Sequence, residues 1–124
     1  MYAIVFWLYL ANAVLLVNHE IDSAYWREWE LFKLPGGVTF FLLVHFPLVA
    51  LVLYGLVLVF QQAAAGLWFS LALGIVGIFT FGIHMLFIKR GHREFRLPVS
   101  VFILAAVLAV SLAQIGFTLY LLMA

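Results

Sequence analysis

The chain has 124 residues, of which 69% are apolar and only 9% are charged at neutral pH. This composition excludes an ordinary soluble domain, which needs more polar surface, and it indicates helices that cross a membrane. The lack of cysteine excludes disulfides, iron–sulfur clusters and thiolate nucleophiles, and a net charge of +1 disfavours nucleic acid as a partner.

Four long apolar segments predict an all-α, polytopic membrane protein, an antiparallel bundle of four transmembrane helices in a single domain. The first segment lacks the basic residues of a signal peptide, so we expect it to be retained as a span. β-strands are disfavoured because the runs are long and do not alternate. The expected spans are residues 2–21, 38–60, 67–88 and 99–123.

The connectors between these segments differ in charge. The second and third spans are joined by the short, uncharged stretch 61–66, whereas the other two connectors hold every charged residue of the protein. Four crossings bring both charged connectors to one side of the membrane. The positive-inside rule then predicts that this side is cytoplasmic and that both termini lie outside.

The connector after the third span is mostly basic. We expect it to set the topology and to attract anionic headgroups of the lipid bilayer. The residues assigned to this role are Lys89, Arg90, Arg93 and Arg96.

The stretch 18–30 holds four of the five acidic residues. If the first helix continues past Val17, helical spacing places His19, Asp22 and Glu30 on one face, and the i, i+3 pair of His19 and Asp22 can bind one metal ion. Glu20 points elsewhere and joins such a site only if the helix breaks nearby. Glu20 and Glu30 are the candidate acid–base groups.

The four histidines, His19, His45, His84 and His92, all fall toward the charged face in the predicted topology. Ionisable side chains within a span are costly and by default functional. We therefore predict a metal site at the cytoplasmic boundary, with His19, Asp22, His45 and His84 as ligands and His92 as an outer ligand. Imidazole and carboxylate suit zinc or iron, which could activate water or, as iron, oxidise a lipid-like substrate.

Two alternatives stay open, and the sequence does not decide whether the protein is an enzyme. The chain could be a non-catalytic subunit of a larger membrane complex, a homo-oligomeric scaffold or a lipid-binding protein, with its histidines satisfied inside the bundle. It could also transfer electrons through a b-type haem with His45 and His84 as axial ligands. That reading leaves the acidic first connector unexplained.

The first connector also supports a family resemblance. The run His19-Glu20-Ile21-Asp22-Ser23, followed by Glu28-Trp29 and Leu31-Phe32, resembles a family of small four-span bacterial membrane proteins of unknown function. Their first connector carries a His-Glu-Leu-Asp-like motif and then a Glu-Trp pair. His45-Phe46-Pro47 and the third-span His84 before a basic loop are similar to further features of that family.

The sequence departs from the family pattern at two positions. Ile21 stands where Leu is usual, and Arg27 stands where a His often precedes the Glu-Trp pair, which removes one candidate ligand. The resemblance implies a four-span fold and the bacterial cytoplasmic (inner) membrane. It implies no activity.

Overall fold

The computed structural model describes residues 1–124 and is entirely helical, which confirms the all-α prediction. A short helix, α2 (Glu28–Leu31), lies among four long ones. Each long helix is long and apolar enough to cross a membrane, which indicates an integral membrane protein. The four are α1 (Tyr2–Tyr25), α3 (Gly37–Phe60), α4 (Ala64–Lys89) and α5 (Pro98–Met123).

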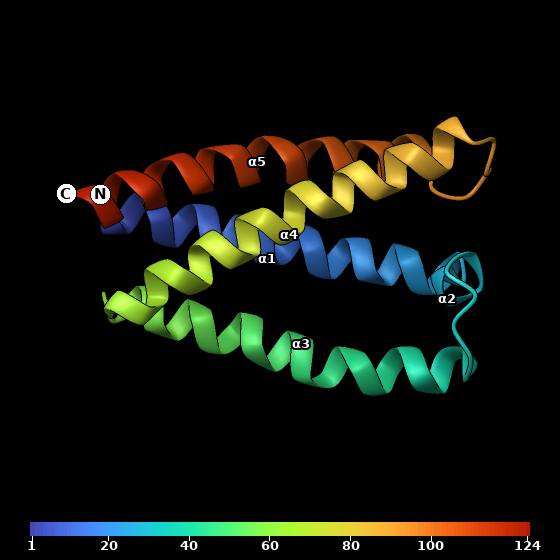
Figure 1. Ribbon diagram of the computed structural model, residues 1–124, viewed down its shortest axis with the longest axis horizontal. Helices are drawn as coiled ribbons and strands as arrows, with labels where there is room; N and C mark the ends of the chain where they lie inside the picture. The colour runs from blue at the N-terminus through green and yellow to red at the C-terminus, as the bar shows by residue number, and fades with distance from the viewer.

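The bundle has two different ends (Figure 1). Both termini lie at one end, and α2 lies at the other with the α4–α5 loop. α4 runs obliquely from α3 toward α5, and α1 contacts α3, α4 and α5. α3 makes no close backbone contact with α5, and only Gly55 and Val59 are buried among its 24 residues. The helix α3 is therefore the least covered of the four.

The apolar core gathers on one face of α1. Its α1 members recur at three- and four-residue steps, the spacing that puts side chains on one side of a helix. Residues from the other three long helices pack against this face. The core comprises Val5, Tyr9, Ala13, Leu16, Val59, Leu73 and Val107.

A buried polar network joins α1, α4 and α5 in mid-bundle. The Asn12 Nδ2 donates to Ser111 Oγ at 3.0 Å and to Gln114 Oε1 at 2.8 Å. The Gln114 Nε2 donates to the Ser70 carbonyl at 2.8 Å, and the hydroxyls of Ser70 and Thr118 are 2.8 Å apart. These bonds tie the helices together at a depth where water offers no alternative partner.

A glycine and a proline mark the starts of α3 and α5 at the charged end of the bundle. The Gly36 residue adopts φ +97 before α3, where a Cβ atom would lie 2.6 Å from Phe40 Cβ. Pro98 occupies the start of α5, where the missing N–H is not needed.

The first helix does not continue as the sequence pattern suggested. α1 ends at Tyr25, and Arg27 adopts a left-handed conformation with φ 55 before α2 begins. The expectation of one helical face through Glu30 is therefore wrong in its last turn. The reversal at Arg27 instead folds α2 beside the end of α1 (Figure 1).

Candidate metal centre

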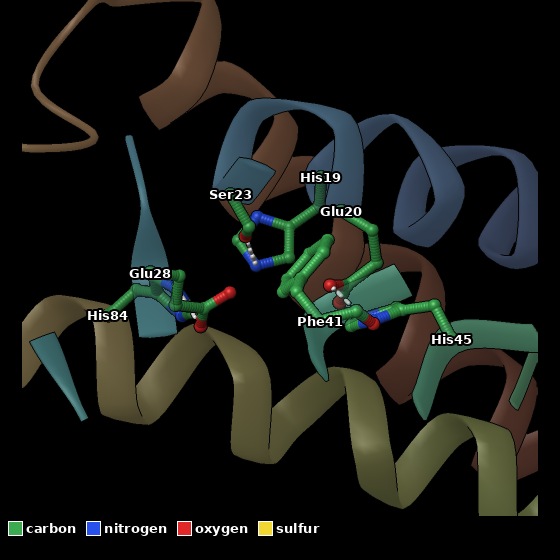
Figure 2. Close-up of polar contacts among 7 residues, drawn as sticks. All are labelled: His19, Glu20, Ser23, Glu28, Phe41, His45 and His84. Atoms are coloured by element: carbon green, nitrogen blue, oxygen red, sulfur yellow. Dashed lines mark hydrogen bonds and ion pairs between the residues drawn. The ribbon is translucent and has the colours of Figure 1, made fainter. Parts of the chain in front are cut away.

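Three side chains from three elements meet at the charged end of the bundle (Figure 2). They are His19 on α1, Glu28 at the start of α2 and His84 on α4, and one ligand atom from each lies within 4.8 Å of the others. His84 Nε2 is 3.1 Å from Glu28 Oε1. The two imidazole rings have centroids 4.4 Å apart and stand nearly perpendicular at 88°. This cluster is called the His19–Glu28–His84 triad below.

The hydrogen bond of His84 Nδ1, the ring nitrogen that does not face Glu28, determines the tautomer of this imidazole. His84 Nδ1 lies 2.7 Å from the Thr80 carbonyl oxygen, which only accepts, so Nδ1 carries a hydrogen. In the neutral ring, Nε2 then presents a lone pair toward the Glu28 carboxylate. Two acceptors at that distance need a proton or a cation between them. His84 Nε2 is also buried without a hydrogen-bond partner.

His19 is likewise held by its own helix. Its Nε2 lies 3.3 Å from the Ser23 hydroxyl one turn later, while its Nδ1 is buried without any partner. The side chain is almost fully shielded, with 1% of its surface exposed. Buried imidazole nitrogens normally have partners, so His19 is not a fully satisfied core histidine.

The carboxyl of Glu28 is suited to bind as an anion. Burial by itself raises its pKa, but the close polar contacts with His84 and Ser23 and the attraction of the two imidazoles lower the pKa further than burial raises it. The net direction is below the ordinary value. The group is thus ionised at neutral pH although only 12% of its side chain is exposed.

Phe95 encloses the triad from the α4–α5 loop. Its fully buried ring lies 4.5 Å from the His84 ring and 5.8 Å from the His19 ring, centroid to centroid. The residue adopts φ 66, an uncommon conformation for a bulky side chain. Such local strain persists where surrounding contacts hold it in place, and it is frequent at functional sites.

A second acid–imidazole pair lies next to the triad (Figure 2). Glu20 Oε2 on α1 is 2.7 Å from His45 Nε2 on α3. His45 Nδ1 lies 2.6 Å from the Phe41 carbonyl, and the Phe41 ring stacks on the imidazole at 4.0 Å. Because His45 Nδ1 must donate to the carbonyl, the short contact to Glu20 requires one proton shared between the two groups.

The triad and the Glu20–His45 pair line the same cavity. This chamber has a volume of about 260 Å³, and its remaining walls are largely aromatic and aliphatic. The residues completing it are Trp29, Phe32, Leu34, Phe40, Phe41, Val44, Phe79, Thr80 and Ile83.

Of the residues that the sequence analysis proposed as ligands, His19 and His84 come together, and His45 lies on the shared chamber with Glu20. Asp22 is outside the triad and accepts a hydrogen bond from Trp26 Nε1 at 3.0 Å. Both ring nitrogens of His45 are engaged, so axial ligation of a haem would require it to leave Glu20.

The remaining candidates lie on the periphery. Glu30 pairs with Arg27 at 2.5 Å, and both side chains are more than half exposed. His92 Nδ1 is 3.6 Å from Glu94 Oε2 within the α4–α5 loop. The basic residues of the loop are exposed, and one of them donates to the Ile88 carbonyl at 3.1 Å near the end of α4. They are Lys89, Arg90, Arg93 and, as that donor, Arg96.

The candidate ligand that helical spacing missed is Glu28. Extending α1 as a regular helix directs attention to Asp22 and Glu30, whereas the turn at Arg27 brings Glu28 over the bundle end. A signal was present in the sequence, because Glu28 opens the Glu-Trp pair that carried the family resemblance.

Comparison with known proteins places the chain in a family without assigning an activity. No curated protein and no solved structure matches it. The sequence pattern of DUF6713, a family of unknown function, matches residues 5–121, which include the whole triad. The chain therefore belongs to this family of unknown function, DUF6713.

Proposed function

We propose that the protein is a membrane-embedded metalloprotein that binds one zinc or ferrous ion through His19, Glu28 and His84. The observation that carries this proposal is the meeting of two buried imidazoles and one carboxylate, with one ligand atom from each within 4.8 Å of the others. These donor types are those that zinc and non-haem iron prefer.

A metal ion accounts for the triad better than a proton does. A proton between His84 Nε2 and Glu28 Oε1 would satisfy that pair but would leave the buried His19 imidazole outside the interaction, with its Nδ1 still unpartnered. The Thr80 carbonyl holds the His84 ring from outside the triad, whereas the Ser23 hydroxyl contacts both His19 Nε2 and the Glu28 carboxyl. Such partners of ligating histidines orient the rings and raise ligand basicity.

The set of two histidines and one carboxylate resembles the ligands of catalytic metal sites more than those of structural ones. Two histidines and one carboxylate leave coordination positions free, as in catalytic zinc sites and in the facial triad of non-haem iron oxygenases. When bound, such an ion supplies Lewis acidity and an activated water. The chamber of about 260 Å³ gives a small ligand room beside the triad.

The Glu20–His45 pair is the proposed acid–base group of this chamber. It holds one shared proton at the chamber wall, at a 2.7 Å contact, and Glu20 retains 33% of its side-chain exposure. A carboxylate and an imidazole sharing a proton can give it to a ligand in the chamber or take a further one from it, and the charge of the pair then changes by one unit. Glu20 therefore keeps the acid–base role proposed from the sequence, whereas Glu30 lies in an exposed surface pair.

The test is metal content of the detergent-purified protein, measured for zinc and iron together with an absorbance spectrum of the same sample. We expect about one metal ion per chain, as a three-ligand site requires, and its loss in His19→Ala and in His84→Ala. His92→Ala is the matched control, since His92 lies outside the triad, and it should retain the metal. Absence of stoichiometric metal would refute the proposal, and a Soret band would favour a haem instead.

A further inference from the structure

A second cavity, about 290 Å³ in volume, is lined by α1, α3 and α4 and extends from the chamber toward the middle of the bundle. Twelve of its fourteen lining residues are hydrophobic, and the two others are Glu20 and His45. This cavity is called the apolar groove below. Its lining contains no lysine or arginine.

The groove follows from how the helices pack. α3 makes no close backbone contact with α5 and buries little of its surface, so it leaves space against α1 and α4. Small side chains, Ala13 on α1 and Ala72 on α4, line that space. On α1 the lining runs from Tyr9 to Glu20, which corresponds to about 16 Å at a rise of 1.5 Å per residue.

The groove adjoins the chamber that holds the triad. Glu20 and His45 line both cavities, so the polar pair stands at the junction between them. Figure 2 shows this pair beside the triad. One end of a ligand in the groove would therefore lie against the Glu20–His45 pair, beside the triad, while the rest stays among apolar side chains.

We infer that the groove binds the hydrocarbon chain of a single-chain lipid whose uncharged polar end reaches Glu20 and His45. This inference rests on the proposed function, because it names the ligand class of the same site. The apolar lining within membrane-spanning helices suits a hydrocarbon chain, and the polar pair suits a hydroxyl or carbonyl group that donates or accepts a hydrogen bond.

Charge selects the end group. The chamber presents two carboxylates, Glu20 and Glu28, and no lysine or arginine. With its shared proton the Glu20–His45 pair is neutral as a whole, and an uncharged end group would leave it so. A fatty carboxylate would add a negative charge beside Glu20 that no lysine or arginine of either cavity offsets, which is costly at this depth.

The test uses hexadecanol carrying a photoreactive diazirine in mid-chain, added to the full-length protein in phosphatidylcholine vesicles. After irradiation, mass spectrometry locates the modified residues. We expect adducts at the partly buried groove residues Val49, Val52 and Phe69 to exceed those at the exposed α5 residue Phe102 by about tenfold. Unlabelled hexadecanol should compete at a concentration about tenfold lower than hexadecanoate. A factor of ten corresponds to about 1.4 kcal/mol.

Two matched variants separate groove binding from general contact with lipid. Ala72→Phe fills the groove and should abolish preferential labelling, whereas Ala109→Phe, at an exposed position of α5 outside both cavities, should not. Metal content is measured on each sample. Ala72→Phe that has lost labelling and kept its metal supports the inference and shows that the bundle is folded.

The remaining outcomes distinguish the two proposals. Equal labelling of groove and lipid-facing residues in protein that holds metal would overturn the groove inference and leave the metal proposal standing. Stronger competition by hexadecanoate would overturn the assignment of an uncharged end group. Preferential labelling in protein without metal would support the groove as a lipid site and overturn the metal proposal.

Discussion

At the scale of single residues, the site depends on which acidic side chain joins the two histidines. His19 and His84 stood out in the sequence because ionisable groups within apolar spans are rare. Their carboxylate partner could not be found in this way. Arg27 takes a left-handed conformation that glycine usually favours, and nothing in its residue type announces the reversal that brings in Glu28.

The two candidate carboxylates give a direct test of this geometry. Glu28→Gln removes the anionic donor of the triad and should lower metal affinity by about 100-fold or more, since ligand loss exceeds the 10–100-fold typical of supporting residues. Asp22→Asn, whose side chain accepts from Trp26 instead, should bind metal as the wild type does. Affinity is measured by competition with a chromogenic chelator. The reverse ranking of the two variants would show that α1 and not α2 supplies the acid.

The lowered pKa of Glu28 predicts a pH dependence of stability. Folding favours the ionised carboxylate, so its contribution is complete above the ordinary pKa of 4.5 and is lost as the pH falls through the lower folded-state pKa. We expect the Tm of metal-free wild type to fall more steeply below about pH 4.5 than that of Glu28→Gln, which has no such proton to bind. If the Tm of the two proteins fell equally steeply below pH 4.5, the pKa of Glu28 would not be lowered by folding.

At the scale of helices, the sequence was sufficient for much of the fold. Uninterrupted apolar runs predict long helices, and α3 and α4 are joined by the short connector that the lack of charge in 61–66 suggested. Two glycines of α4, Gly74 and Gly77, lie against Ser111 of α5, and the two helices pack together. The end of α1 was less predictable, because hydrophobic periodicity fades in the polar stretch after Val17.

Two glycines of α4 differ in how closely other atoms surround them, so replacing each by alanine tests helix packing. At Gly66 a Cβ atom would lie 2.7 Å from the backbone of Leu58 and Val59, whereas at Gly82 it would meet nothing within 4 Å. Gly66→Ala should therefore cost about 1–3 kcal/mol, the range for overpacking. Gly82→Ala should be neutral or stabilising by up to about 1 kcal/mol, the difference in helix propensity.

The measurement for this pair is equilibrium unfolding in mixed detergent micelles, with helicity as the readout. Both variants are the same change in the same helix, so any difference between them reports local packing. Equal stabilities would mean that α3 and α4 are not in contact at Gly66.

At the scale of the whole molecule, composition and four crossings lead to a proposal about orientation. The two charged connectors, α1–α3 and α4–α5, lie at the same end of the bundle, and both termini lie at the other end. The positive-inside rule places the loops with Lys89 and Arg90 in the cytoplasm. Composition does not predict that α3 lies apart from α5. This position depends on side-chain packing, and it creates the groove.

Because the chain has no cysteine, single introduced cysteines can report this orientation without background. Arg93→Cys, in the α4–α5 loop, should react with a membrane-impermeant maleimide only after cell lysis. Gln62→Cys, in the α3–α4 turn, should react in intact spheroplasts. Labelling in the opposite order would place the basic loop and the triad outside the cytoplasm.

The central claim is that two histidines and one glutamate from separate helices hold a metal ion at the charged end of the bundle. The most direct measurement is anomalous diffraction at the zinc and iron absorption edges from crystals of the purified protein. The account predicts one peak about 2.0–2.2 Å from a nitrogen of His19, a nitrogen of His84 and an oxygen of Glu28. No peak there, or one at Glu20 and His45 or at His92 and Glu94 alone, would contradict it.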